Sequence, residues 1–303
     1  MNFLTPEILQ MFVSLGLDLA YLLLAATMSV LVLLPMIRFA IGKNVRLGDV
    51  LFVRDNPVAG LEIGGMLLLV FYQSRCMLQG DAVGNAFASD MIATVIGIAA
   101  SVAVMAVARA ALGRFVHGHN KGQDLNHEIF EQRNWAAACV SLALCVGVVN
   151  GITEEDVLGM TPMRDGAIAL TVLALGLGAT QLYRITHMRG AHFMRTFFSD
   201  DNPAAGVSLL GFAVAANMVT HAAAGVAKAG SWNAAPAVLV TIGYATCMLG
   251  LLVLIRYGVE VTLKRVWGHD IADEIFSQKN VGAGFIDAAV MIGSALIVTV
   301  SMA

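Results

Sequence analysis

The chain has 303 residues, of which 58% are hydrophobic and only 13% are charged, whereas a soluble domain carries about 25% charged residues. Its net charge of −3 and the lack of any run of Lys or Arg exclude nucleic acid as a partner, because phosphate binding needs a basic patch. The composition predicts an integral membrane protein.

Eight apolar runs are long enough to cross a bilayer, whose core of about 30 Å needs about 20 apolar residues in a helix. The expected fold class is therefore an all-α integral membrane protein with eight transmembrane helices. In chain order the runs are Gly16 to Phe39, Asn56 to Gln79, Asp90 to Leu112, Asn134 to Thr153, Gly166 to Arg184, Asn202 to Val226, Ala235 to Arg256, and Asn280 to Ser301.

The loop cations predict an orientation. Of the 18 Lys and Arg residues, all but Arg75, Arg164 and Lys228 lie in or beside the loops after the first, third, fifth and seventh spans. Cations next to a span are retained on the cytoplasmic side, so these loops should be cytoplasmic and both termini outside. Four arginines at the inner ends of the odd-numbered spans are interpreted as anchors that complement the helix dipole: Arg38, Arg109, Arg184 and Arg256.

The chain contains an internal repeat. The segment that begins Asp55-Asn56-Pro57 matches the segment that begins at Asp201, at an offset of 146 residues, and the segment from Asp124 matches that from Asp270 at the same offset. Such self-similarity predicts a direct duplication, with one four-helix unit at residues 1–153 and a second at 154–303.

A shorter pattern recurs within each unit: Phe, three residues, Asn, two residues, Ala. It begins at Phe52, Phe130, Phe198 and Phe276, and each copy opens an even-numbered span. The building block is therefore expected to be a two-helix hairpin used four times. Each hairpin crosses the membrane twice, so all four should share one orientation.

The paired Asp-Asn-Pro-x-Ala-Gly segments and the Glu-Ile-Phe-x-Gln-x-Asn-x-x-Ala segments resemble the YjfL-type bacterial inner-membrane family, domain of unknown function 350, in a duplicated form. The resemblance implies a bacterial cytoplasmic membrane protein. The family has no established activity that could be carried over to these residues.

Four asparagines open the even-numbered spans and are predicted to cap them: Asn56, Asn134, Asn202 and Asn280. Asn is a favoured N-cap residue, and the proline that follows Asn56 and Asn202 suits the first helical position. Capping and close packing of small residues account for the motif. The alternative is that the four helix N-termini converge and hold an anion.

Two carboxylates lie deep inside predicted spans, Glu62 in the second and Asp287 in the eighth. A buried charge in a membrane is costly and usually faces a partner, a protein interior or a water-filled cavity. At the repeat offset Glu62 corresponds to Ser208, and Asp287 corresponds to Ser141. The alternatives for Glu62 are extension to the headgroups, a protonated carboxyl in a hydrogen bond, or a lock between helices.

These patterns favour a transporter or channel for a small solute or ion, with Glu62 and Asp287 as its polar centre. The alternative is a membrane scaffold or envelope-stress component that binds a cytoplasmic partner protein or anionic lipid. No nucleophile and base pair, cofactor motif or fixed metal-ligand geometry is recognisable, so we expect neither an enzyme nor a bound cofactor or metal. The expected partner is the lipid bilayer, and a homo-oligomer is left open.

Overall fold

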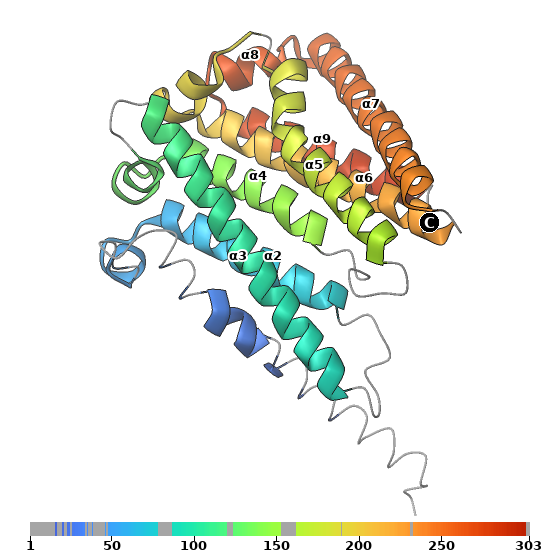
Figure 1. The fold of residues 1–303 in the computed structure, drawn as a ribbon. Helices are drawn as coiled ribbons and strands as arrows, with labels where there is room; N and C mark the ends of the chain where they lie inside the picture. Colours follow the sequence, from blue (N-terminus) through green and yellow to red (C-terminus); the bar gives the residue numbers. More distant parts are fainter. Residues whose placement is uncertain are drawn as a thin grey trace, which may run out of the picture.

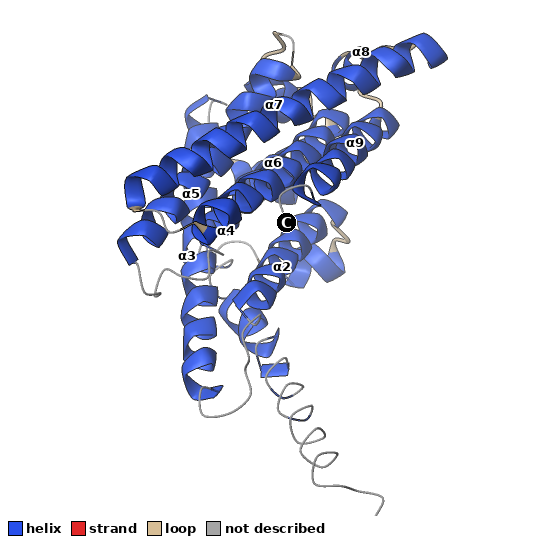
Figure 2. Ribbon diagram, turned by 90° about the vertical axis from the view of Figure 1, so that its right-hand side faces the viewer, coloured by secondary structure: helices blue, strands red, loops and turns tan. Residues whose placement is uncertain are grey.

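The computed structural model describes residues 26–33, 48–77, 87–119, 124–152, 162–188, 190–230 and 233–300, together with isolated positions between 16 and 46. Helices are the only regular structure in these residues, and Figure 2 shows no strand among them, which confirms the all-helical expectation. Five described helices are long and apolar enough to cross a membrane, which indicates a membrane protein.

Besides helical residues between positions 16 and 38, the described part of the chain contains seven long helices and four short helical turns. The long helices are α2 (Pro57–Met77), α3 (Phe87–His119), α4 (Trp135–Ile152), α5 (Pro162–Thr186), α6 (Pro203–Ala229), α7 (Ala234–Trp267) and α9 (Val281–Val300). The short turns are η1 (Asp49–Val53), η2 (His127–Glu131), η3 (Arg195–Ser199) and α8 (Ile271–Phe276).

The helices α2, α4, α6 and α9 form a row in which each packs against the next (Figure 1). The helices α3, α5 and α7 cover this row, since α3 packs on α2 and α4, α5 on α4 and α6, and α7 on α6 and α9. Small residues let helices approach closely, and Gly284 of α9 illustrates this: a Cβ there would lie 3.0 Å from the Cα of Ala204 in α6.

Each helix of the row begins in the same way. The residue before the asparagine adopts a positive φ at all four positions, Asp55, Arg133, Asp201 and Lys279, with values between 42° and 59°. The backbone N–H of the asparagine then donates to the backbone carbonyl six residues earlier, which lies in the preceding turn. Because left-handed backbone is unfavourable for Arg and Lys, its recurrence at all four positions marks a shared turn geometry.

The structure differs from the predicted spans at several boundaries. The helices α3 and α7 continue past Leu112 and Arg256, the predicted ends, to His119 and Trp267. Two further apolar helices, Pro57–Gln73 and Trp135–Gly151, are shorter than the five candidate spans. The first predicted span, Gly16 to Phe39, lies mostly outside the described residues, so eight spans stay a prediction.

Candidate functional site: two buried clusters around carboxylates

Glu62 of α2 is buried inside the bundle and bound by side chains from two other helices. The guanidinium of Arg109, from α3, donates to both carboxylate oxygens, at 3.0 Å from Nε and 3.2 Å from Nη2. Ser141 of α4 donates to the same carboxylate at 2.6 Å, and Arg109 Nη1 donates to Asn126 Oδ1 at 2.9 Å. We call these four residues the Glu62 cluster. Their geometry is that of an internal ion pair, in which Glu62 binds protein groups and does not extend to the helix end.

Asp287 of α9 is buried in a second cluster. Arg256 of α7 donates from Nε to Asp287 at 2.8 Å and from Nη1 to Glu260, one turn further along α7, at 2.9 Å. Ser208 of α6 donates to the other oxygen of Asp287, and the hydroxyl of Tyr183 in α5 donates to Ser208 at 2.8 Å. We call these five residues the Asp287 cluster. It joins four helices, α5, α6, α7 and α9.

The two clusters contain the same three chemical groups, but the carboxylate and the serine lie on opposite helices of the pair. In both, a serine donates to a carboxylate on a neighbouring helix of the row, 79 residues away in sequence. The carboxylate stands on the first helix of the pair in the Glu62 cluster and on the second in the Asp287 cluster. The arginine comes each time from the covering helix between them, α3 or α7. Each cluster therefore contains a guanidinium, a carboxylate and a hydroxyl.

The interpretation of Arg109 and Arg256 as anchors at helix ends is wrong. Their side chains are only 3% and 5% exposed and lie inside the bundle, paired with carboxylates. The physical reason is the length of α3 and α7, which continue for more than two turns beyond these arginines. Sequence analysis missed this role because a charged residue at the end of an apolar run suggests the end of a span.

The four asparagines lie at the starts of the row helices and make two kinds of contact. Their side-chain oxygens accept hydrogen bonds from backbone amides in the first turn of α2, α4, α6 and α9. The side-chain amides of the first three donate to backbone carbonyls of the turn before the next row helix: Asn56 to Ile129 and Phe130, Asn134 to Phe197, and Asn202 to Ile275. Asn56, Asn134 and Asn202 therefore tie each row helix to the turn before the next row helix as well as capping their own helices.

A cavity of about 370 Å³ adjoins the Glu62 cluster. Arg109 and Asn126 form part of its wall, together with Arg114, His117 and Asp124 near the end of α3. Arg109 lines the cavity and binds Glu62 directly, so only the Arg109 side chain separates the carboxylate from this polar cavity. It is lined by the same end of α3 that the loop cations predict to be cytoplasmic.

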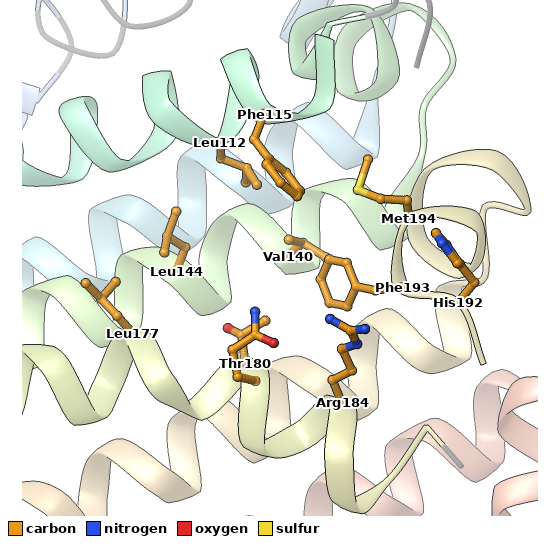
Figure 3. A pocket seen from close by; sticks show the side chains of 11 residues that line it. Leu112, Phe115, Val140, Leu144, Leu177, Thr180, Arg184, His192, Phe193 and Met194 are labelled. Atoms are coloured by element: carbon orange, nitrogen blue, oxygen red, sulfur yellow. The ribbon is translucent and has the colours of Figure 1, made fainter. Parts of the chain in front are cut away.

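A second cavity, of about 400 Å³, lies between α3 and α5 with α4 as its floor (Figure 3). Its wall is mostly apolar, with Leu112 and Phe115 facing Leu177 across the gap. Arg184 and His192 lie at one end, and both side chains are exposed. The cavity is thus an apolar groove with the Arg184 guanidinium and the His192 imidazole at one end.

Neither a curated protein nor a solved structure matches the chain. The region that a family model matches runs from α5 to α9 and includes Asp287, Ser208 and Arg256. That region, residues 165–302, is similar to the DUF350 family, a domain of unknown function.

Proposed function

We propose that the chain is a membrane transporter or channel for a small ion, and that the Glu62 and Asp287 clusters form its polar centre. The observation that carries the proposal is that both carboxylates point into the helix bundle and bind arginine and serine there. Carboxylates used only at a membrane surface would extend outward instead. Ionisable groups kept inside a membrane bundle mark ion or proton pathways by default.

The contacts provide a physical route for coupling. A buried ion pair contributes little net stability compared with an apolar pair of the same shape, so its retention in both halves favours a role beyond packing. Protonation of Glu62 would remove the charge that holds Arg109, and the guanidinium would then turn toward the adjoining cavity. Helices α2, α3 and α4 meet at Glu62, so the loss of its ion pair with Arg109 would change the packing between these helices.

Proton movement provides the most direct test. The full chain is reconstituted in vesicles that contain a pH-sensitive dye, and a pH gradient is imposed while potassium and valinomycin clamp the membrane potential. We expect Glu62→Gln combined with Asp287→Asn to abolish the flux of the unmodified chain. Glu131→Gln, which alters an exposed carboxylate on η2, is the matched control. Flux that persists in the double variant would remove both carboxylates from the mechanism.

We further propose that the chain crosses a bacterial inner membrane eight times as two duplicated four-helix units, with both termini outside. The shared positive φ before each asparagine and the 79-residue spacing of both serine–carboxylate bonds support the duplication. Reporter fusions after Arg114 and after Arg265 should report the cytoplasmic side, and a fusion at the C-terminus should report the opposite side. Fusions that place residues 114 and 265 on different sides would contradict this topology.

One observation favours the second interpretation, a scaffold that binds anionic lipid. The groove between α3 and α5 offers an apolar wall for an acyl chain and Arg184 for a phosphate, a combination typical of anionic headgroup sites. If it is used, Arg184→Gln should lower the retention of phosphatidylglycerol over phosphatidylcholine in native mass spectra. Arg265→Gln, which alters another exposed cation at the end of α7, is the control. Equal retention in both variants would exclude this groove as the lipid site.

A further inference from the structure

Successive hairpins in this chain contact one another through a repeated interface. The turns η2, η3 and α8 each pack between two helices of the row: the one that follows them in sequence and the one from the preceding hairpin. The preceding helix is α2 for η2, α4 for η3 and α6 for α8. In all three cases the asparagine of the preceding hairpin donates to a carbonyl of the turn.

No described hairpin precedes the first turn, η1, and its surface is open among the described residues. The turn η1 packs on its own helix α2. Its Phe52 is 85% exposed, whereas the corresponding Phe130 and Phe198 are each 3% exposed. An apolar side chain that is buried in the equivalent turns is thus left uncovered at this end of the row.

The last helix of the row is open on the complementary face. Asn280 is exposed, whereas Asn56, Asn134 and Asn202 are at most 3% exposed. Its side-chain amide donates to Glu274 within its own hairpin, and the described residues include no later turn that could accept a bond like those of the other three asparagines. Phe285 is 62% exposed, whereas Cys139, at the same position of α4, is 1% exposed.

The helix contacts follow the same rule. The fourth residue after the asparagine of one helix packs on the second residue after the asparagine of the preceding helix. A Cβ at Gly206 would lie 2.9 Å from Ala136 Cα, and one at Gly284 would lie 3.0 Å from Ala204 Cα. The unused positions are Gly60 on α2, which has open space around it, and Gly282 on α9, which is exposed.

We propose that a second copy of this chain continues the row, with its η1 and α2 packed against α9 of the first copy. Asn280 of one copy then donates to the carbonyls of residues 51 and 52 in the next, and Gly60 lies against Gly282. The proposal commits to a second copy because three internal interfaces already show what covers each of these surfaces. It does not depend on transport.

The contact is head-to-tail, because each copy contributes a different surface. A repeated head-to-tail contact generates a ring if the rotation closes and an open array otherwise. All helices of the row begin at the same kind of turn, so the copies would keep a common orientation in the membrane. An interface between identical surfaces, α2 with α2 or α9 with α9, is excluded by this arrangement.

Cross-linking distinguishes these geometries. A chain with Gly60→Cys and a differently tagged chain with Gly282→Cys are co-expressed, and the membranes are treated with a mild oxidant. We expect a cross-linked dimer that contains both tags, since a disulfide requires Cα atoms within about 7 Å. The unsubstituted chains provide the background from native cysteines. No cross-link above that background, or equal cross-linking between two Gly60→Cys chains, would overturn the proposal.

A second measurement tests the interface without added thiols. The open space around Gly60 accommodates a large side chain within one copy, so Gly60→Trp should fold normally but prevent the close approach of another copy. Gly250→Trp on α7, which also has open space, is the matched control. We expect the purified chain and Gly250→Trp to give oligomer masses in lipid nanodiscs, and Gly60→Trp to give monomers. A monomeric unsubstituted chain, or an oligomeric Gly60→Trp chain, would contradict the head-to-tail contact.

Discussion

Exchanging the acid and the hydroxyl within the Glu62 cluster tests whether the two halves share one plan. The double variant Glu62→Ser with Ser141→Asp gives the first half the arrangement that Ser208 and Asp287 have in the second. Arg109 and its covering helix stay unchanged. If the plan is shared, the exchanged cluster should pair the guanidinium again, although each single substitution disrupts it.

The contacts set the expected magnitudes. Arg109 donates two hydrogen bonds to Glu62 and a third to Asn126, so Glu62→Ser removes both bonds to a charged acceptor. Breaking a buried ion pair by removing one partner costs about 3–5 kcal/mol. In the Asp287 cluster the carboxylate accepts one bond from Arg256 and one from Ser208, so the double variant should recover one of the two lost arginine bonds. One charge-assisted bond corresponds to about 1.5–3 kcal/mol of recovery.

The assay is a double-mutant cycle on equilibrium unfolding of the detergent-solubilised chain, followed by helix content as SDS is added. Residues in direct contact show coupling energies of about 0.5–3 kcal/mol, and the expected sign here is favourable. The reverse exchange, Ser208→Glu with Asp287→Ser, serves as the matched experiment in the second half. A double variant as unstable as the sum of the two single variants would refute the equivalence of the clusters.

Two further predictions concern the packing of the row. Gly284→Ala should destabilise the chain by about 1–3 kcal/mol, because the added Cβ meets the backbone of α6. Gly293→Ala on the same helix adds its Cβ to open space and should leave the stability unchanged, so only Gly284→Ala should lower the unfolding midpoint. Asn202→Ala should lower the free energy of unfolding by about 1–3 kcal/mol, because it removes both the helix cap and the bond to Ile275. Asn202→Asp should lower it less, since a carboxylate still caps the helix. Equal losses for the two variants in the same assay would contradict the double role.

The helical class and the starts of the row helices could be predicted from sequence because both depend on local chemistry. Continuous apolar runs leave the backbone no partner but its own helix. An asparagine followed by proline is a strong start signal, and α2 and α6 begin at Pro57 and Pro203. The positive φ before each asparagine was not predictable residue by residue, since Arg133 and Lys279 have no preference for left-handed backbone.

The partners of the buried carboxylates could not be predicted because they depend on tertiary contacts between helices. Hydropathy places a span end at a charged residue, and this rule put Arg256 at a boundary although α7 continues to Trp267. The spacing did hold one usable signal. Two of the three covering helices, α3 and α7, carry an arginine ahead of the following turn, Arg109 and Arg256. In both cases a carboxylate lies on one of the two row helices that the covering helix contacts.

The exchange of acid and hydroxyl between the halves separates a structural lock from a transport role. Arginine reaches the cluster from between two row helices, so a carboxylate on either helix can pair with it, through two hydrogen bonds for Glu62 and one for Asp287. A structural lock requires nothing more. An ion pathway also depends on which helix places the carboxylate beside Arg109, because Arg109 lines the adjoining cavity. Measured together on the variant with Glu62→Ser and Ser141→Asp, restored stability with restored proton flux would place the function in the ion pair itself. Restored stability without flux would assign it to Glu62 on α2, and would identify the Asp287 cluster as the structural partner.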